Sequence, residues 1–590
     1  MKAKQIFPLI TTLVLIVTLF GAIPATAAPT GVSLAAASGP KPKFSDNVAF
    51  DVSPTLRELA AHRITPPLPE EDQGEIREEH GPEANESDVY FQDTAVQNSI
   101  PATIPNTSTN FEGLSNQDNF NIFGGRVNPP DPVGDVGPNH YVQMVNLTFA
   151  IYDKQGNRLL GPVDTGTLWD GFVIPDCTDP SGDPVVLYDQ FADRWLLSQF
   201  TTRGLDDPSL PFYDCVAISA TPDPTGAYYR YAFKTQADPE SPPGGSFFPD
   251  YPKYSVWKDS YVMTTRDFGL VTGYGISVYA LEKNKMVNGQ AKARAVQFFL
   301  DSNVVPLNLI GDGLLPPDVD GKTKPKNDAP APIIGTQDDG SGYGGTIDAL
   351  NIWELNVLWN SRPSASLIYK AQLPVASFDS IFPCGVVPGS LPPSSRDCLP
   401  EPGITDGSRY LDILSYRQRP TYRLAYRNFG TYESFVTNQS VEATPGVAGV
   451  RWYEIRRVNG AYSVYQQGTY APGDGVHRWM GSVAQDKKGN MAVGYSVVNG
   501  TTVFPGIRYT GRLAGDPLGQ LTLGEGTIIN GSGVQTTTNS RWGDYTSMNI
   551  DPVDDCTFWY VNEYYQVSGT PADTRPWQTR IASFKLPGCN

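Results

Sequence analysis

Three arginines, each followed by an aromatic residue, are the side chains whose type and spacing most clearly suggest chemistry. These pairs are Arg409-Tyr410, Arg478-Trp479 and Arg541-Trp542. A guanidinium group binds a carboxylate, sulfate or phosphate through paired hydrogen bonds, so converging arginines would form an anion-binding site. Lys253 holds a comparable position in an earlier segment and completes the candidate ligand-binding set. The alternative, which the repetition favours, is that these cations pair with carboxylates and hold neighbouring repeats together.

A pair of carboxylates is the second possible source of chemistry, because glycoside hydrolysis uses two of them. The candidates are Asp544 in RWGDY and Glu563 in WYVNEYY. The aromatic residues around Glu563 would either stack on sugar rings or pack between strands. Alternation along a strand does not say which face is wet, and we favour packing.

Metal and cofactor chemistry has little support in the sequence. The chain has only four histidines, so a histidine metal cluster or a Ser-His-Asp triad is not expected. Acidic runs at 551–555 and at Asp338-Asp339 offer the oxygen ligands that Ca²⁺ prefers, without the spacing of a known calcium loop. We therefore predict no metal and no other cofactor, with Ca²⁺ as the alternative.

Six cysteines in a chain that reads as exported indicate disulfides. They are Cys177, Cys215, Cys384, Cys398, Cys556 and Cys589. Six cysteines allow 15 connectivities, and none of these shows the CxxC spacing of metal or redox sites. Pairing in sequence order is our prediction, so that 556–589 ties the end of the chain to its last repeat.

The first 27 residues are typical of a secretory signal. Lys2 and Lys4 precede a mostly apolar stretch from 6 to 20, and Ala25-Thr26-Ala27 fits the small-residue cleavage rule. A retained membrane anchor is the alternative, but no basic stop-transfer pattern follows. No later stretch approaches the ~20 apolar residues that a spanning helix needs. We expect a secreted or extracytoplasmic protein with no membrane insertion after cleavage.

A hairpin that recurs along the chain must position all these side chains. Two apolar runs around a polar turn are found at 140–157, 183–200, 253–268, 331–357, 408–428, 477–497 and 540–565. Such repetition is typical of β-propeller blades. We predict an all-β fold in which 111–590 form a single propeller of seven blades, with long Pro/Gly-rich loop insertions at 301–346 and 376–407. A pair of β-sandwiches is the alternative, but it does not explain the recurring hairpin.

Residues 28–110 have little strand pattern. The stretch 67–88 is charged and poor in apolar residues, which predicts a solvated acidic, Pro-rich linker or a pro-segment. Earlier in 28–110, residues 55–62 fit a short helix that would need packing against the rest of the protein to be stable.

The net charge of −18 restricts the class of partner. An acidic surface disfavours nucleic acids and anionic membranes. The expected partner of this protein, which we take to be a monomer, is an extracellular small molecule, glycan or protein.

Four segments carry a resemblance to known proteins. DPVGDVGPNHYVQMVN, GDPVVLYDQFADRW, DKKGNMAVGYS and RWGDYTSMNIDPVDDCTFWYVNEYY resemble, in the same order, a group of exported bacterial proteins that are propeller-like and have no established activity. The resemblance covers about 110–590. It implies export and architecture and assigns no functional residue.

Two functional hypotheses remain. The first is an exported binding or scaffold propeller for extracellular glycans, peptides or cell-surface material. The second is a glycoside hydrolase or lyase that acts on polysaccharides with a carboxylate pair at the propeller mouth. An enzyme requires that pair to be accessible in a cleft and not paired with arginine, whereas a binding module has its carboxylates already paired.

Overall fold

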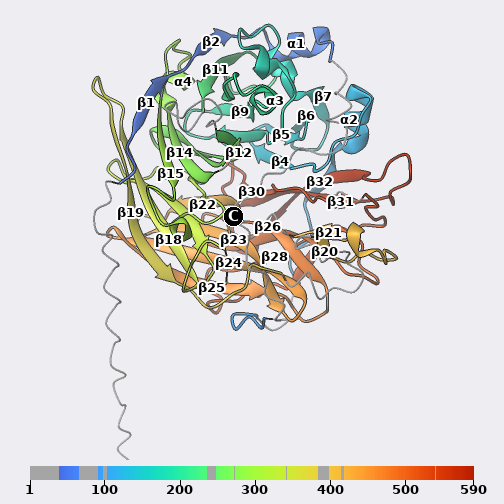
Figure 1. Ribbon diagram of the computed structural model, residues 1–590. Helices are drawn as coiled ribbons and strands as arrows, with labels where there is room; N and C mark the ends of the chain where they lie inside the picture. The colour runs from blue at the N-terminus through green and yellow to red at the C-terminus, as the bar shows by residue number, and fades with distance from the viewer. Residues whose placement is uncertain are drawn as a thin grey trace, which may run out of the picture. The chain divides into compact units, whose positions relative to one another are not determined.

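The computed structural model describes residues 39–65, 91–97, 103–235, 247–270, 273–340, 342–382, 397–413, 418–537 and 540–590. These residues form seven antiparallel sheets arranged in a ring, which is a seven-bladed β-propeller (Figure 1). The fold class predicted from the recurring hairpins is confirmed. No helix in the described ranges is long and apolar enough to cross a membrane.

The blades follow one another along the chain, each with its innermost strand first. Blade 1 consists of β4 (Val133–Val136), β5 (His140–Val145), β6 (Thr148–Asp153) and β7 (Arg158–Asp164). Blade 2 consists of β8 (Val185–Asp189), β9 (Arg194–Phe200), β10 (Tyr213–Ser219) and β11 (Tyr228–Lys234). Blade 3 consists of β12 (Phe247–Val256), β13 (Ser260–Gly269), β14 (Tyr274–Glu282) and β15 (Arg294–Asp301).

The remaining blades continue the same order. Blade 4 consists of β17 (Ala331–Gln337), β18 (Ala349–Leu358) and β19 (Ser364–Pro374). Blade 5 consists of β22 (Thr421–Asn428), β23 (Glu433–Thr444), β24 (Val447–Val458) and β25 (Ala461–Tyr470). Blade 6 consists of β26 (His477–Gln485), β27 (Met491–Val498), β28 (Gly506–Arg512) and β29 (Glu525–Ile529). Blade 7 consists of β30 (Ser547–Ile550), β31 (Thr557–Tyr565), β32 (Trp577–Lys585) and an earlier strand, β3 (Thr109–Ser115).

Strand β3 closes the ring. It pairs with β32, with Thr109 opposite Ser583 and Phe111 opposite Ile581, so the last blade contains strands from both ends of the propeller segment. A closed ring has no first or last blade edge left unpaired at the seam. The short strand β16 (Pro317–Val319) lies between blades 3 and 4 in the chain and pairs in parallel with β22, the first strand of blade 5.

The segment before β3 differs from the prediction of a linker. Strand β1 (Lys43–Asp46) pairs with β15 on the outer edge of blade 3, and β2 (Ala49–Val52) pairs with β11 on the outer edge of blade 2. Helix α1 (Leu56–His62) follows, and Thr55 caps it through a reciprocal contact with Glu58. Each strand has only four residues, which is too short for alternation to reveal it. The helix lies where the sequence predicted one.

Blades pack against each other through apolar side chains, as the strand pattern requires. Large buried clusters lie between blades, and eight tryptophans are almost fully buried. Helices other than α1 are short connections: α2 (Asn116–Phe123), α3 (Arg203–Asp206) and α4 (Lys283–Val287).

Two of the predicted disulfides are confirmed. Cys177 pairs with Cys215, and Cys556 pairs with Cys589. The third predicted pair includes Cys384, which lies outside the described residues, so it stays a prediction.

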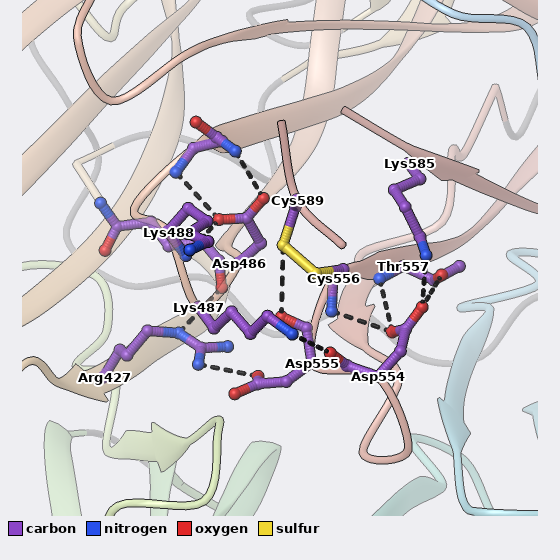
Figure 2. The surroundings of a disulfide bond; sticks show 12 residues. Arg427, Asp486, Lys487, Lys488, Asp554, Asp555, Cys556, Thr557, Lys585 and Cys589 are labelled. Atoms are coloured by element: carbon purple, nitrogen blue, oxygen red, sulfur yellow. Dashed lines mark hydrogen bonds and ion pairs between the residues drawn. A yellow bond between two sulfur atoms is a disulfide. The ribbon is translucent and has the colours of Figure 1, made fainter. Parts of the chain in front are cut away.

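The second disulfide fastens the C-terminus to the blade that closes the ring (Figure 2). Next to it, the Asp555 carboxylate pairs with Arg427 of blade 5 at 2.8 Å, and the Asp555 carbonyl accepts from the Lys487 amide of blade 6 at 2.9 Å. Asp554 pairs with Lys585 of β32 at 2.8 Å. The end of the chain is therefore linked to three blades.

Replacing Cys556 and Cys589 together by serine should destabilise the closing blade. Chain-entropy arguments for a loop of 33 residues give at most about 3–4 kcal/mol. We expect a lower urea midpoint and earlier proteolysis at β32, measured by fluorescence and by mass mapping of the fragments. Free thiols at both cysteines in the purified wild-type protein would contradict the assignment.

Candidate functional site

The strongest concentration of charge lies where the chain begins its innermost strands. We call it the axial cluster, and its members are Asp131, Asp183, Asp250, Lys253, Arg266, Asp312, Arg419, Arg541 and Asp544. The members, from Asp131 before β4 to Asp544 before β30, come from the segments of six blades, and blade 6 contributes none. The repeat thus brings equivalent positions together around one axis.

A recurring backbone turn places the cluster. Asp131 and Asp183 lie just before β4 and β8, and Tyr251 lies at the bulge of β12; all three have positive φ and are followed directly by a proline. Positive φ at the first residue and the fixed φ of the proline together bend the chain at this point. The sequence Asp-Pro-Val occurs at both 131–133 and 183–185. This repeated motif is the sequence signal that marks Asp131 as equivalent to Asp183.

Ion pairs connect the cluster across blades. Arg266 of blade 3 contacts Asp312 at 2.7 Å, and Arg419 lies 3.4 Å from the same carboxylate. Arg419 also lies 3.7 Å from Asp544, which pairs with Arg541 at 2.9 Å. Successive blades are therefore joined by shared carboxylates.

Lys253 occupies the centre of this cluster. Its Nζ lies 2.9 Å from the ring centre of Tyr251 and 3.1 Å from that of Tyr545, and it has no hydrogen-bond partner among the described residues. Burial lowers its pKa well below the ordinary value, and nearby Asp183 opposes that shift. The Tyr545 hydroxyl donates to Asp183 at 3.1 Å.

A second layer of charge lies further along the inner strands. Arg423 of β22 pairs with Asp318 at 2.9 Å and with Asp320 at 2.7 Å, and its Nε donates to the carbonyl of Met548 in β30 at 3.0 Å. Asp135 of β4 accepts from the Tyr188 amide of β8 at 2.7 Å. Each of these contacts crosses from one blade or segment to another.

Burial raises the pKa of several axial carboxyl groups. The pKa of Asp131 is about 7, with Asp544 adding to the effect of burial, and that of Asp135 is about 7, with Asp318 adding to it. Burial likewise raises the pKa of Asp250 and of Asp318 to about 6. Such values suit either acid–base chemistry or a sealed structural core.

The cavity volume at this end of the axis decides between acid–base chemistry and a structural core. Among the described residues, the cavity lined by Tyr251, Lys253, Arg266 and Arg419 has a volume of about 10 Å³. That is space for about one water molecule. A sugar ring does not fit there.

The predicted arginine ring is wrong. Arg409 lies in a single turn of 3₁₀ helix, Gly407–Arg409, where its side chain is 43% exposed and faces Asp406 at 3.6 Å. Inner strand β22 begins only at Thr421, so the motif at 408–428 was aligned on the wrong arginine. Arg419 and Arg423 hold the axial positions of blade 5.

Arg478 and Arg541 also do not converge. Arg478 is in β26 and pairs with Asp474 and Glu525 of its own blade, at 2.8 and 2.7 Å. Arg541 pairs with Asp544 in the axial cluster. Both are buried against carboxylates, which agrees with the packing alternative. Of the candidate binding cations, Lys253 and Arg541 belong to the axial cluster.

The two candidate catalytic carboxylates lie near each other but are enclosed. Glu563 of β31 is fully buried, and one of its oxygens accepts from the Gly543 amide at 2.6 Å. Burial raises its pKa well above the ordinary value, and Asp131 and Asp544 add to the effect. The aromatic residues around it, Trp559, Tyr560, Tyr564 and Tyr565, are buried and pack between strands.

The acidic runs differ in their surroundings. At 551–555, Asp551 pairs with Lys154, Asp554 with Lys585 and Asp555 with Arg427, so protein cations already face these carboxylates. The oxygens of Asp338, Asp339 and Asp348 lie within 4.8 Å of one another. Backbone amides donate to Asp338 and Asp348, as in a hydrogen-bonded turn.

Comparison with known proteins gives matches to solved structures at low similarity. An α-L-arabinanase from Penicillium chrysogenum matches with a TM-score of 0.31 and 10% identity, over 71% of this chain and 96% of that chain. The α-L-arabinofuranosidase Arb93A from Fusarium graminearum matches with a TM-score of 0.31 and 9% identity, over 67% and 90%. A thermostable family-43 glycoside hydrolase matches with a TM-score of 0.28 and 10% identity, over 64% and 98%. TM-scores this low carry no argument about activity. No family model and no curated protein matches the chain.

Replacing Arg423 by alanine should destabilise the protein strongly. It leaves two buried carboxylates without their cation, which typically costs about 3–5 kcal/mol. The matched control is Arg409→Ala, whose exposed side chain should contribute less than about 0.5 kcal/mol. Urea unfolding of both variants measures the difference, and equal stability of the two would contradict the structural role of the second layer.

Stability should fall as the pH rises from about 4 to about 7. A carboxyl whose pKa is raised in the folded protein above its unfolded value of ~3.9 binds more protons when folded across that range. Burial lowers the pKa of His477 to about 4 and also lowers that of His140, so these two groups act in the opposite direction, but they stand against a larger number of carboxyls. We expect a higher melting temperature at pH 5.5 than at pH 8.

The variant Asp131→Asn tests whether the raised carboxyl pKa values cause this effect. It should reduce the difference in melting temperature between pH 5.5 and pH 8. Asp206→Asn, at an exposed position of blade 2, is the control and should leave it unchanged. A melting temperature that rises from pH 5.5 to pH 8 in the wild type would contradict the assignment.

Proposed function

We propose that the protein is an exported binding or scaffold propeller for extracellular glycans, peptides or cell-surface material. The observation that carries this proposal is the state of the axial carboxylates. Asp312 and Asp544 face arginines, and the adjoining cavity has space for about one water molecule. Hydrolysis of a glycan requires a carboxylate pair that a sugar can reach.

Export is the second part of the proposal. The two disulfides are typical of proteins that fold in an oxidising compartment. The signal-like N-terminal sequence and the acidic net charge of −18 agree with it. Ligand contact would then occur on loops and blade edges, which is where scaffolds of this kind carry binding residues.

One observation favours the second candidate, a polysaccharide hydrolase or lyase. The pKa of Asp131, about 7, and that of Asp250, about 6, lie in the range that a general acid needs near neutral pH. Against it stand the small volume of the axial cavity and the burial of Glu563.

The two candidates are separated by giving the purified mature protein a panel of insoluble polysaccharides and a glycan array. A binding module should be retained on a ligand and release no reducing ends over a day. Asp131→Asn should bind as the wild type does. Release of reducing ends by the wild type that Asp131→Asn abolishes would overturn the proposal in favour of the hydrolase.

A further inference from the structure

A cavity of about 110 Å³ lies between blades 2 and 3, apart from the axial cluster. Its walls come from three parts of the chain. Blade 2 contributes Asp214, Phe233, Lys234 and Thr235, blade 3 contributes Met263, Tyr279, Leu281, Ala295 and Gln297, and β1 contributes Lys43 and Ser45. The segment that crosses from β1 to β2 pairs with the outer strands of both blades, so the cavity lies beneath this crossing.

Asp214 makes this cavity unusual. Its residue is 1% exposed, and neither carboxylate oxygen has a hydrogen-bond partner within ordinary geometry. Burial raises its pKa well above the ordinary value, nearby Asp267 adds to the shift, and Tyr254 opposes it. Buried carboxylates in proteins are normally paired or hydrogen-bonded, because desolvation without a partner is costly.

The Tyr254 hydroxyl faces Asp214 and can supply it with at most one hydrogen bond, whereas Asp267, Gln297 and Tyr279 bond to other groups. Asp267 accepts from the hydroxyls of Thr265 and Ser277. Gln297 donates to Ser277 and to the Tyr279 hydroxyl, which in turn donates to the carbonyl of Thr235 at 2.8 Å. Among the described residues around the cavity, the Asp214 carboxyl and the hydroxyls of Thr235 and Tyr254 lack a hydrogen-bond partner of ordinary geometry.

Charge is distributed unevenly along the cavity. Its buried end has the Asp214 carboxyl and its walls are mostly apolar, with Phe233, Met263 and Leu281 among them. Lys234 and Lys43 are exposed lining residues and mark the end that reaches solvent. The Asp214 carboxyl at the buried end would bind a cationic group, and the lysine ammonium groups at the solvent end would bind an anionic group. The cavity is therefore complementary to a molecule that has a cation at one end and an anion at the other.

We propose that this cavity binds a small aliphatic amino acid, whose ammonium group enters and pairs with Asp214 while its carboxylate stays near Lys234. An engineered cavity of ~150 Å³ holds benzene, so 110 Å³ accommodates an ammonium group and a short aliphatic chain. The positive charge of the entering ammonium group favours ionisation of the Asp214 carboxyl, whose proton is released to solvent, and the ammonium N–H groups donate hydrogen bonds to the resulting carboxylate. Apolar walls favour methylene groups over a polar chain.

The test is isothermal titration calorimetry of the full-length exported protein with three probes of similar length. 4-Aminobutanoate has both charges, butylammonium has only the cation, and butanoate has only the anion. We expect binding of 4-aminobutanoate, at least tenfold weaker binding of butylammonium, and no binding of butanoate. Lys234→Ala should remove the advantage of 4-aminobutanoate over butylammonium.

Asp214→Asn should abolish binding of both amines, with Asp206→Asn as the control that leaves binding unchanged. Asp214→Leu provides a stability measurement, because an apolar residue removes an unpaired buried acid, and we expect its melting temperature to equal or exceed that of the wild type. The proposal is overturned if 4-aminobutanoate does not bind at millimolar concentration, or if folded Asp214→Asn binds it as well as the wild type does. A melting temperature of Asp214→Leu well below that of the wild type would also overturn it, since Asp214 would then be a structural acid. None of these outcomes depends on the proposed glycan or cell-surface role.

Discussion

Charge buried along the axis of a closed ring is the constraint on which the rest of this structure depends. Seven inner strands meet there, and charged residues lie just before several of them or within them. A charge taken out of water must be paired, because the cost of desolvating it alone is several kcal/mol. Arg419 and Arg423 are each buried and each face two carboxylates from other segments. Pairing therefore couples the blades to each other, and the ring stays closed only while the blades keep their relative positions.

The same constraint explains why this axis differs from an active site. The carboxyl groups with raised pKa values lie in an enclosed network, and the cavity beside them has space for about one water molecule. A raised pKa there follows from burial and does not require a substrate. Closure at the seam depends on a different part of the chain, where β3 completes blade 7 and Cys556–Cys589 fastens the C-terminus.

Much of the fold could be predicted because its signals are local. Turn residues between two apolar runs lie within a few positions of each other, so most of the hairpins could be read directly. The range 408–428 is the exception, because it contains β22 but not its partner β23. The Cys556–Cys589 pair could be predicted because both cysteines lie in the last repeat. The four-residue strands β1 and β2 could not, since their stability comes from pairing with distant edges and not from their own pattern.

The candidate site was predicted less well, because register decides which side chain reaches the axis. The Arg-aromatic motif at Arg409 looked like those at Arg478 and Arg541, yet a loop and a 3₁₀ turn separate it from β22. Asp131 was not among the candidates, although the Asp-Pro-Val sequence that it shares with Asp183 marks its position. Nothing near Asp214 in the sequence indicates that it lacks a partner, because that depends on two blades at once.

A double-mutant cycle on Arg266 and Asp312 tests most directly whether the axial cluster holds the propeller together. The two side chains contact each other at 2.7 Å, and both residues are buried. If the cluster is structural, each alanine replacement lowers the free energy of unfolding by several kcal/mol, and the coupling energy stabilises the folded state by at least about 1 kcal/mol. Replacements that leave stability unchanged or raise it would contradict the account, because residues kept for function typically behave in that way.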